Sequence, residues 1–181
     1  MKVTETFLKG CFIIEPIVFG DHRGNFFEVF NQKIFEEKIG LKIDFVQDNQ
    51  SISQRGVLRG LHLQKGKYAQ AKLVRVIKGS VLDIAVDVRK DSPTFGKHFS
   101  IVLTEENNQQ LFVPRGFLHG FATLEDHTIF SYKCDNYYHK ESEDGVLYND
   151  IDLSIDWGLK DFEIQLSDKD KLLPSFQDFQ D

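Results

Sequence analysis

Short apolar segments separated by turn residues run along most of this chain. Many alternate apolar and polar positions or are rich in Val, Ile and Phe, which is typical of β-strands. We expect ten strands, at residues 11–19, 24–30, 45–52, 57–63, 71–77, 81–88, 98–103, 110–113, 117–124 and 129–135. Strands at this spacing with few helices predict an all-β fold, an antiparallel sandwich or barrel.

One short helix is expected to interrupt the strands. Asn31 can cap its start, Phe30 and Phe35 occupy the two positions of a hydrophobic staple, and Gly40 can end it. After Trp157 the sequence is mixed and polar, so we expect a C-terminal tail that wraps the body or frays.

A tight hairpin turn is predicted at residues 78–80, which read Lys-Gly-Ser between two strands. In a two-residue loop, even positions before the turn pair with odd positions after it, and side chains alternate between faces. Lys72 and Asp83 should therefore point the same way. The shared face would comprise Lys72, Val74 and Val76 with Val81, Asp83 and Ala85.

Length and charge narrow the possible functions. The 181 residues carry no internal repeat or linker, so we expect a single domain over 1–181. A net charge of −6 gives no general reason to bind nucleic acid or an anionic membrane, and an anionic ligand would need a local cluster of Arg and Lys. Without a signal-peptide core or a spanning apolar run, and with two widely spaced cysteines, the chain is expected to be cytoplasmic.

Ionisable groups stand inside two of the most apolar strands. Arg59 and His62 lie in one, and Lys72 and Arg75 in the next. Charges are costly inside a protein unless they are paired, hydrogen-bonded or used on a ligand. A His base near an ammonium suits removal of a proton next to a carbonyl, because the enolate oxygen needs a positive partner. The alternative is a core His62 satisfied by a backbone carbonyl.

Metal binding is the main competing interpretation. Jelly-roll barrels often hold a metal on several His and a carboxylate. Here His62 has no second His two residues on, and His119 is the other well-placed imidazole. Two His without a nearby third ligand disfavour a metal site, so none is predicted.

Polar side chains elsewhere could line a pocket. Gln47 and Asn49 alternate onto one face of their strand, although an edge strand would explain them too. Arg23 lies in a turn, with Phe26 and Glu28 following on one face, and an Arg in such a turn is usually solvated.

The second half of the chain offers further candidates. Tyr132 and Tyr138 lie in or just after an aromatic strand, where packing is the common role and proton donation the alternative. Lys169 and Asp170 fall in a Ser-Asp-Lys-Asp run that otherwise suggests a helix start or a solvated turn.

Taken together, these segments resemble the dTDP-4-dehydrorhamnose 3,5-epimerase family. The resemblance covers nearly the whole chain in order and spacing, at residues 15–16, 19–24, 45–49, 58–62, 72–75, 91–96, 114–121, 132–133, 137–138 and 167–170. It implies a cupin-type jelly roll that works as a homodimer on a dTDP-sugar, with no metal or organic cofactor.

The resemblance also implies roles for the catalytic candidates. His62 matches the base that removes the protons at C3 and C5 of a 4-keto sugar, and Asp170 matches the carboxylate that orients it. Lys72 matches the cation beside the sugar O4, and Tyr132 the acid that returns a proton from the opposite face.

The remaining matches concern substrate binding. His119 and Asp83 match residues that line the sugar pocket. Nucleotide and diphosphate contacts are matched by Arg59, Gln47, Asn49 and Lys169, with Tyr138 as a pocket wall. Phe19, Arg23, Phe26 and Glu28 resemble a segment that reaches into the partner's site. Strict alternation puts Arg59 and His62 on opposite faces, which a bulge at Gly60 would resolve.

The expected reaction is conversion of dTDP-4-dehydro-6-deoxy-D-glucose to dTDP-4-dehydro-L-rhamnose through enolates. An epimerase acting at C3 or C5 alone is the nearest alternative. A metal-dependent cupin oxygenase and a non-catalytic sugar-nucleotide binder are the alternatives from other classes.

Overall fold

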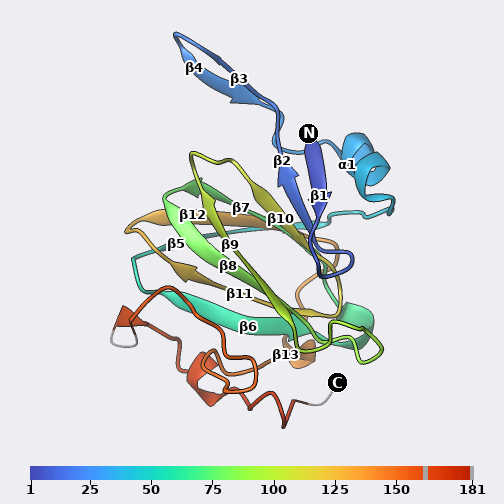
Figure 1. Cartoon of the computed structure of the whole chain (residues 1–181), viewed down its shortest axis with the longest axis vertical. Coiled ribbons are helices and arrows are strands. Elements are labelled where there is room, and N and C mark those ends of the chain that lie inside the picture. Colours follow the sequence, from blue (N-terminus) through green and yellow to red (C-terminus); the bar gives the residue numbers. More distant parts are fainter. Residues whose placement is uncertain (161–162, 180–181) are drawn as a thin grey trace.

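Two antiparallel β-sheets face each other in the computed structural model, which describes residues 1–160 and 163–179 (Figure 1). One sheet has the strand order β1-β2-β10-β7-β12-β5 and the other β13-β6-β11-β8-β9, while β3 and β4 form a separate hairpin. The strands are β1 (Lys2–Glu5), β2 (Phe12–Glu15), β3 (Val18–Asp21), β4 (Gly24–Phe27), β5 (Gln47–Ser53), β6 (Leu58–Gln64), β7 (Lys72–Lys78), β8 (Ser80–Asp87), β9 (His98–Thr104), β10 (Gln110–Val113), β11 (Phe117–Thr123), β12 (Thr128–Cys134) and β13 (Glu143–Gly145). This is the jelly-roll sandwich that the sequence predicts.

The strand predictions differ from the structure mainly at the N-terminus. The strand expected at 11–19 is broken at Pro16 into β2 and β3, because proline lacks the N–H that a continuous ladder requires. The short strands β1 and β13 were not predicted, and β13 reads Glu-Asp-Gly, which carries no strand signal.

The predicted helix is confirmed as α1 (Gln32–Ile39). The Asn31 side chain accepts a hydrogen bond from the backbone N–H of Ile34 at 3.2 Å, and Gly40 ends the helix at φ 73°. The rings of Phe30 and Phe35 lie 5.6 Å apart, as expected for the staple. Phe35 and Ile39 pack with Ile14, Leu73 and Phe112, so α1 covers part of the six-stranded sheet.

The predicted hairpin at residues 78–80 is wrong. β7 pairs with β10 and β12, whereas β8 pairs with β9 and β11, so the turn at Gly79 carries the chain from one sheet to the other. A Gly-containing turn signal is local, and it does not tell whether the flanking strands pair or separate. Lys72 and Asp83 do face the same interior, but from opposite sheets.

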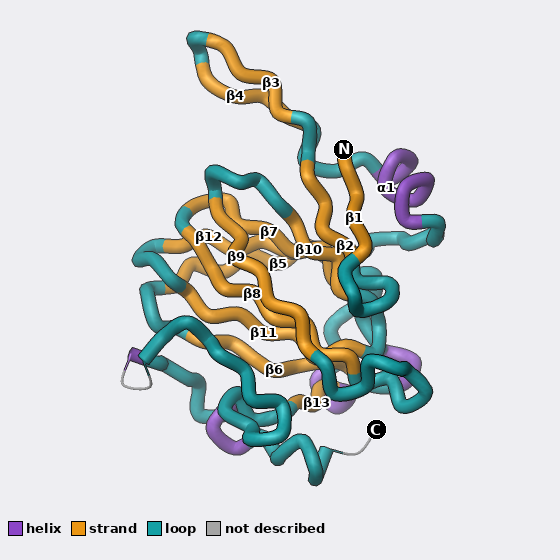
Figure 2. The backbone as a smooth tube through the Cα atoms, in the orientation of Figure 1, coloured by secondary structure: helices purple, strands orange, loops and turns teal. Residues whose placement is uncertain are grey.

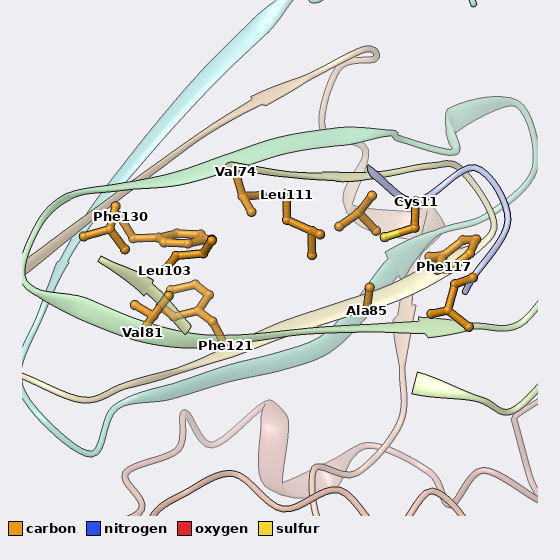
Figure 3. Packing of buried hydrophobic residues seen from close by; sticks show 12 residues of the cluster. Cys11, Val74, Val81, Ala85, Leu103, Leu111, Phe117, Phe121 and Phe130 are labelled. Atoms are coloured by element: carbon orange, nitrogen blue, oxygen red, sulfur yellow. The ribbon is translucent and has the colours of Figure 1, made fainter. Parts of the chain in front are cut away.

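The interior between the sheets is packed with apolar side chains. Figure 3 shows Val74 and Leu111 pointing inward from one sheet toward Val81, Ala85 and Phe121 of the other. Rings of Phe121 and Phe130 stack with their centroids 4.1 Å apart, and Cys11 is buried in the same cluster. This packing fixes the separation of the two sheets.

The segment after β13 forms loops and short turns beside the five-stranded sheet (Figure 2). Leu153 and Trp157 pack against Ile84, Val86 and Leu118, and the Trp157 Nε1–H donates to the Tyr148 carbonyl at 2.8 Å. Short 3₁₀ turns are η1 (Gly66–Tyr68), η2 (Lys140–Ser142) and η4 (Asp170–Leu172). The tail therefore wraps the body, and it delivers Asp170 to β6.

The β3–β4 hairpin projects away from the sandwich (Figure 1). Phe19 and Phe26 on this hairpin are 64% and 75% exposed. Over the described residues, no helix has the length and apolar character needed to cross a bilayer.

Candidate active site

A cavity of about 640 Å³ interrupts the apolar packing between the sheets. A smaller hollow of about 260 Å³ shares part of its wall. The predicted site residues that line the larger cavity are Asn49, Arg59, His62, Lys72, His119, Tyr132, Lys169 and Asp170. The smaller hollow adds Gln47 and Tyr138. Most of the predicted residues are thus brought together from β5, β6, β7, β11, β12 and the tail.

A bulge in β6 lets Arg59 and His62 face the same cavity. His62 pairs with His119 and Arg59 with Phe121, so two residues of β6 lie opposite the single residue Gly120. Gly60 has φ +125°, and a Cβ there would lie 2.6 Å from the Gly120 Cα. Only glycine suits such a position. The predicted bulge is confirmed.

His62 is hydrogen-bonded to a buried carboxylate. Its Nε2 lies 2.6 Å from Oδ1 of Asp170, which is 4% exposed. Burial alone would raise the pKa of Asp170, but the hydrogen bond and charge of His62, with contributions from Ser167 and the Gly60 N–H, hold it below its usual range. The ionised carboxylate fixes the proton on Nε2 and leaves Nδ1 as a base, without a hydrogen-bond partner in the described part of the chain.

Lys72 brings an ammonium into the cavity. It forms no hydrogen bond or ion pair with the described residues, and its Nζ lies 6.0 Å from the centre of the Tyr132 ring. Burial lowers the pKa of Lys72, while the negative charges of Asp83 and Glu143 offset part of this effect. An ammonium without a partner can stabilise negative charge that develops on a ligand.

Tyr132 offers a protonated hydroxyl. It lies on β12 beside Asn49 of β5 and Val74 of β7. Burial raises the pKa of Tyr132, and the Arg59 charge offsets part of this effect. The phenol therefore remains a proton donor at neutral pH.

A second His–carboxylate pair lies deeper. His119 Nε2 contacts the two carboxylate oxygens of Asp83 at 3.1 and 3.0 Å, and the two residues are 6% and 0% exposed. Neighbouring strands β11 and β8 position this pair.

One residue of the smaller hollow was missed by sequence reasoning. Glu143 forms an ion pair with Lys169 and accepts a hydrogen bond from the Tyr138 hydroxyl at 2.7 Å. This hydrogen bond, with burial, raises the pKa of Tyr138 to about 12. In sequence, Glu143 belongs to a Glu-Ser-Glu-Asp run that is indistinguishable from a solvated surface segment.

The hairpin residues lie apart from the cavity within one chain. Arg23 forms an ion pair with Asp21 at 2.5 Å, and the Glu28 carboxylate accepts a hydrogen bond from the Asn31 amide at 3.1 Å. Phe19 and Phe26 are exposed. Among the residues that the structure describes, no group of three or more His, Cys, Asp or Glu side chains is arranged to hold a metal ion.

The fold and the cavity together define a cupin-type jelly-roll enzyme whose interior carries groups for acid–base chemistry. Residues 5–178 match the family model described as dTDP-4-dehydrorhamnose 3,5-epimerase. The chain belongs to this family of isomerases.

Individual relatives are similar over nearly their full length. A dTDP-4-dehydrorhamnose 3,5-epimerase from Shigella flexneri is 52% identical over 94% of this chain and 93% of its own. The crystal structure of the enzyme of that name from Elizabethkingia anophelis is 57% identical, with a TM-score of 0.95 over 98% of this chain and 97% of the other. A dTDP-6-deoxy-D-glucose-3,5-epimerase from Legionella pneumophila, in complex with dTDP-4-keto-L-rhamnose, is 46% identical, with a TM-score of 0.95 over 99% of this chain and 94% of the other.

Proposed function

We propose that this protein inverts C3 and C5 of dTDP-4-dehydro-6-deoxy-D-glucose and produces dTDP-4-dehydro-L-rhamnose for dTDP-L-rhamnose biosynthesis. Family membership and the ligand of the Legionella relative support this substrate. The observation that carries the proposal is the 2.6 Å contact between His62 and Asp170, in a cavity that Lys72 and Tyr132 also line.

Each inversion is a proton exchange next to a ketone. Nδ1 of His62 removes the proton from the sugar carbon, and the electron pair moves onto O4, where the Lys72 ammonium stabilises the enolate. The Tyr132 hydroxyl then donates its proton to the opposite face of the same carbon and re-forms the ketone. The phenolate and the imidazolium return to their starting forms by proton exchange with water before the second carbon reacts.

The other cavity residues bind the nucleotide and the sugar. Arg59 and Lys169 supply positive charge for the diphosphate, which a chain of net charge −6 needs locally. The sugar contact is His119, which the fully buried Asp83 supports from behind, and the nucleotide contacts are Gln47, Asn49 and Tyr138. Neutral amide and aromatic side chains can recognise the nucleotide by its shape and its hydrogen-bonding groups, without adding charge to the site.

The functional form is a homodimer in the cytoplasm, with residues 1–181 as one domain. An isolated two-stranded hairpin is marginally stable in water, and the exposed Phe19 and Phe26 of β3–β4 require a surface to cover them. In the dimer, Phe19, Arg23, Phe26 and Glu28 enter the partner's cavity.

Mixing two inactive variants tests whether the β3–β4 hairpin of one chain completes the cavity of its partner. When chains with His62→Ala and chains with Arg23→Ala are unfolded and refolded together, about half of the dimers should be heterodimers, each with one intact site. Activity should return to about one quarter of the native level. If the hairpin served its own chain, the mixture would stay inactive.

Proton exchange in deuterated water tests the reaction. With the 4-keto substrate, NMR should show deuterium and inverted configuration at both C3 and C5. Inversion at one carbon alone would identify a single-position epimerase instead. Binding of dTDP with no exchange at either carbon would identify a non-catalytic binder.

A further inference from the structure

A chain of hydrogen bonds along the wall of the smaller hollow ends on a thiol. The backbone N–H of Tyr138 donates to Oε1 of Gln47 at 3.0 Å, and Nε2 of Gln47 donates to Oδ1 of Asn49 at 3.1 Å. Nδ2 of Asn49 then donates to Sγ of Cys134 at 3.6 Å. We refer to these four groups as the amide relay.

The first donor fixes the direction of the relay. A backbone N–H can only donate, so Gln47 must present its oxygen to Tyr138 and its nitrogen to Asn49. Asn49 must therefore present its oxygen to Gln47 and its nitrogen to Cys134. The thiol sulfur is a weak acceptor and completes the sequence. Burial raises the pKa of Cys134 to about 11, so the thiol remains neutral.

The relay decides what the two amides offer to a ligand. Each amide oxygen already accepts a hydrogen bond within the relay, while each amide nitrogen keeps one hydrogen that the relay does not use. Gln47 and Asn49 both border the hollow, as do His62 and Lys72. This wall therefore presents N–H donors, which suit the oxygen atoms of a diphosphate or a sugar.

Cys134 lies buried behind this wall and does not itself border the hollow. It pairs with Gln47 on one side and with Lys72 on the other, so the three side chains stand in one row on the inner face of the sheet. Asn49 and Tyr132 pair in the next row.

We propose that Cys134 is a positioning residue for substrate binding, whose sulfur anchors the Asn49 amide at the far end of the relay, with its remaining N–H toward the ligand. The inference rests on the proposed function, because that function makes Gln47 and Asn49 substrate contacts. Without the sulfur, the Asn49 amide keeps only its contact with Gln47, so its side chain is held less firmly and its N–H points less often toward the ligand, which weakens binding.

Calorimetric titration with dTDP and steady-state kinetics test this role. Cys134→Ala should raise Kd and KM about 3- to 10-fold, the range that corresponds to one hydrogen bond, with kcat within about twofold of native. Cys134→Ser keeps an acceptor at this point and should recover most of the loss. Cys11→Ala is the matched control, because Cys11 is equally buried but packs in the apolar cluster, and it should leave KM unchanged.

A double-variant comparison separates positioning from general packing. If Cys134 acts through Asn49, adding Cys134→Ala to Asn49→Ala should not weaken dTDP binding further. Additive losses, a Kd for Cys134→Ala within about twofold of native, or equal losses for Cys11→Ala would overturn the proposal. Failure of the native protein to bind dTDP would instead overturn the proposed function itself.

Discussion

Two regions of the interior treat buried charge in opposite ways. Asp87, which is 0% exposed, accepts hydrogen bonds from Nε of Arg89 at 2.8 Å, from Oγ of Ser92 at 2.5 Å and from Oγ1 of Thr94 at 2.6 Å. Lys72 in the cavity has no hydrogen-bond or ion-pair partner in the described residues. The fold satisfies the first charge completely and leaves the second available.

The pKa values reflect the same difference. Burial alone would raise the pKa of Asp87, but the surrounding donors lower it to about 2. Burial lowers the pKa of Lys72, and nearby carboxylates offset that effect in part. Removing a group from a fully partnered buried charge destabilises the native state, whereas a buried charge without partners already costs stability and is a candidate for ligand binding.

The largest effect is expected where the cavity performs chemistry. His62→Ala removes the base, and turnover should fall by about 10²–10⁴-fold. Because His62 acts on the sugar, dTDP affinity by calorimetry should remain near the native value. His98→Ala on β9, outside the cavity lining, is the control and should retain activity. Native turnover by His62→Ala would remove the assigned base.

Tyr132→Phe should separate proton removal by His62 from proton return to the opposite face. The variant keeps His62 and Lys72, so deuterium should still enter C3 and C5, while formation of inverted product falls by about 10²-fold or more. NMR of the sugar protons measures both quantities. Tyr137→Phe, at a residue that is 65% exposed, is the control. An unchanged product yield with Tyr132→Phe would exclude Tyr132 as the acid.

Many features of the fold could be predicted from the sequence, because local patterns encode strands, helix caps and bulges. The short apolar segments predicted most of the strands, and Asn31 and Gly40 predicted the ends of α1. Gly60 pointed to the bulge, since alternation alone could not bring Arg59 and His62 to one cavity.

The remaining features depend on contacts between distant segments. The turn at Gly79 has the same local chemistry whether β7 and β8 pair or separate, and only packing of both sheets decides. Glu143 acquires its role from Lys169 and Tyr138, which no spacing rule connects to it. The hydroxyl groups that donate to Asp87 belong to Ser92 and Thr94, and the sequence of their loop predicts only a turn.

Asp87→Asn should destabilise the fold without altering the chemistry. Loss of the charge-assisted hydrogen bonds should lower the free energy of unfolding by about 2–3 kcal/mol, measured by urea denaturation. Activity per folded molecule should be native. Asp91→Asn, an exposed residue on the same loop, should leave stability unchanged.

The lowered pKa of Asp87 predicts that the folded state loses stability in acid. The carboxylate's folded pKa of about 2 lies below the ordinary 3.8, so its stabilisation is present above pH 3.8 and is lost as the pH falls toward 2. The difference corresponds to about 2 kcal/mol. In Asp87→Asn, the free energy of unfolding should depend less on pH in this acidic range. An unchanged pH dependence would contradict the lowered pKa of Asp87.

Lys72→Met should change the free energy of unfolding less than Asp87→Asn does, and should raise it instead of lowering it. Folding depresses the pKa of Lys72, so the charged form is destabilised at neutral pH, where the unfolded chain holds the proton more tightly. Methionine has a similar length and carries no charge to desolvate, so the free energy of unfolding should rise by about 1 kcal/mol while turnover falls. Lys42→Met at an exposed site is the matched control and should change neither. If Lys72→Met lowered stability as Asp87→Asn does, Lys72 would be a structural charge with a partner, and the distinction between the two regions would fail.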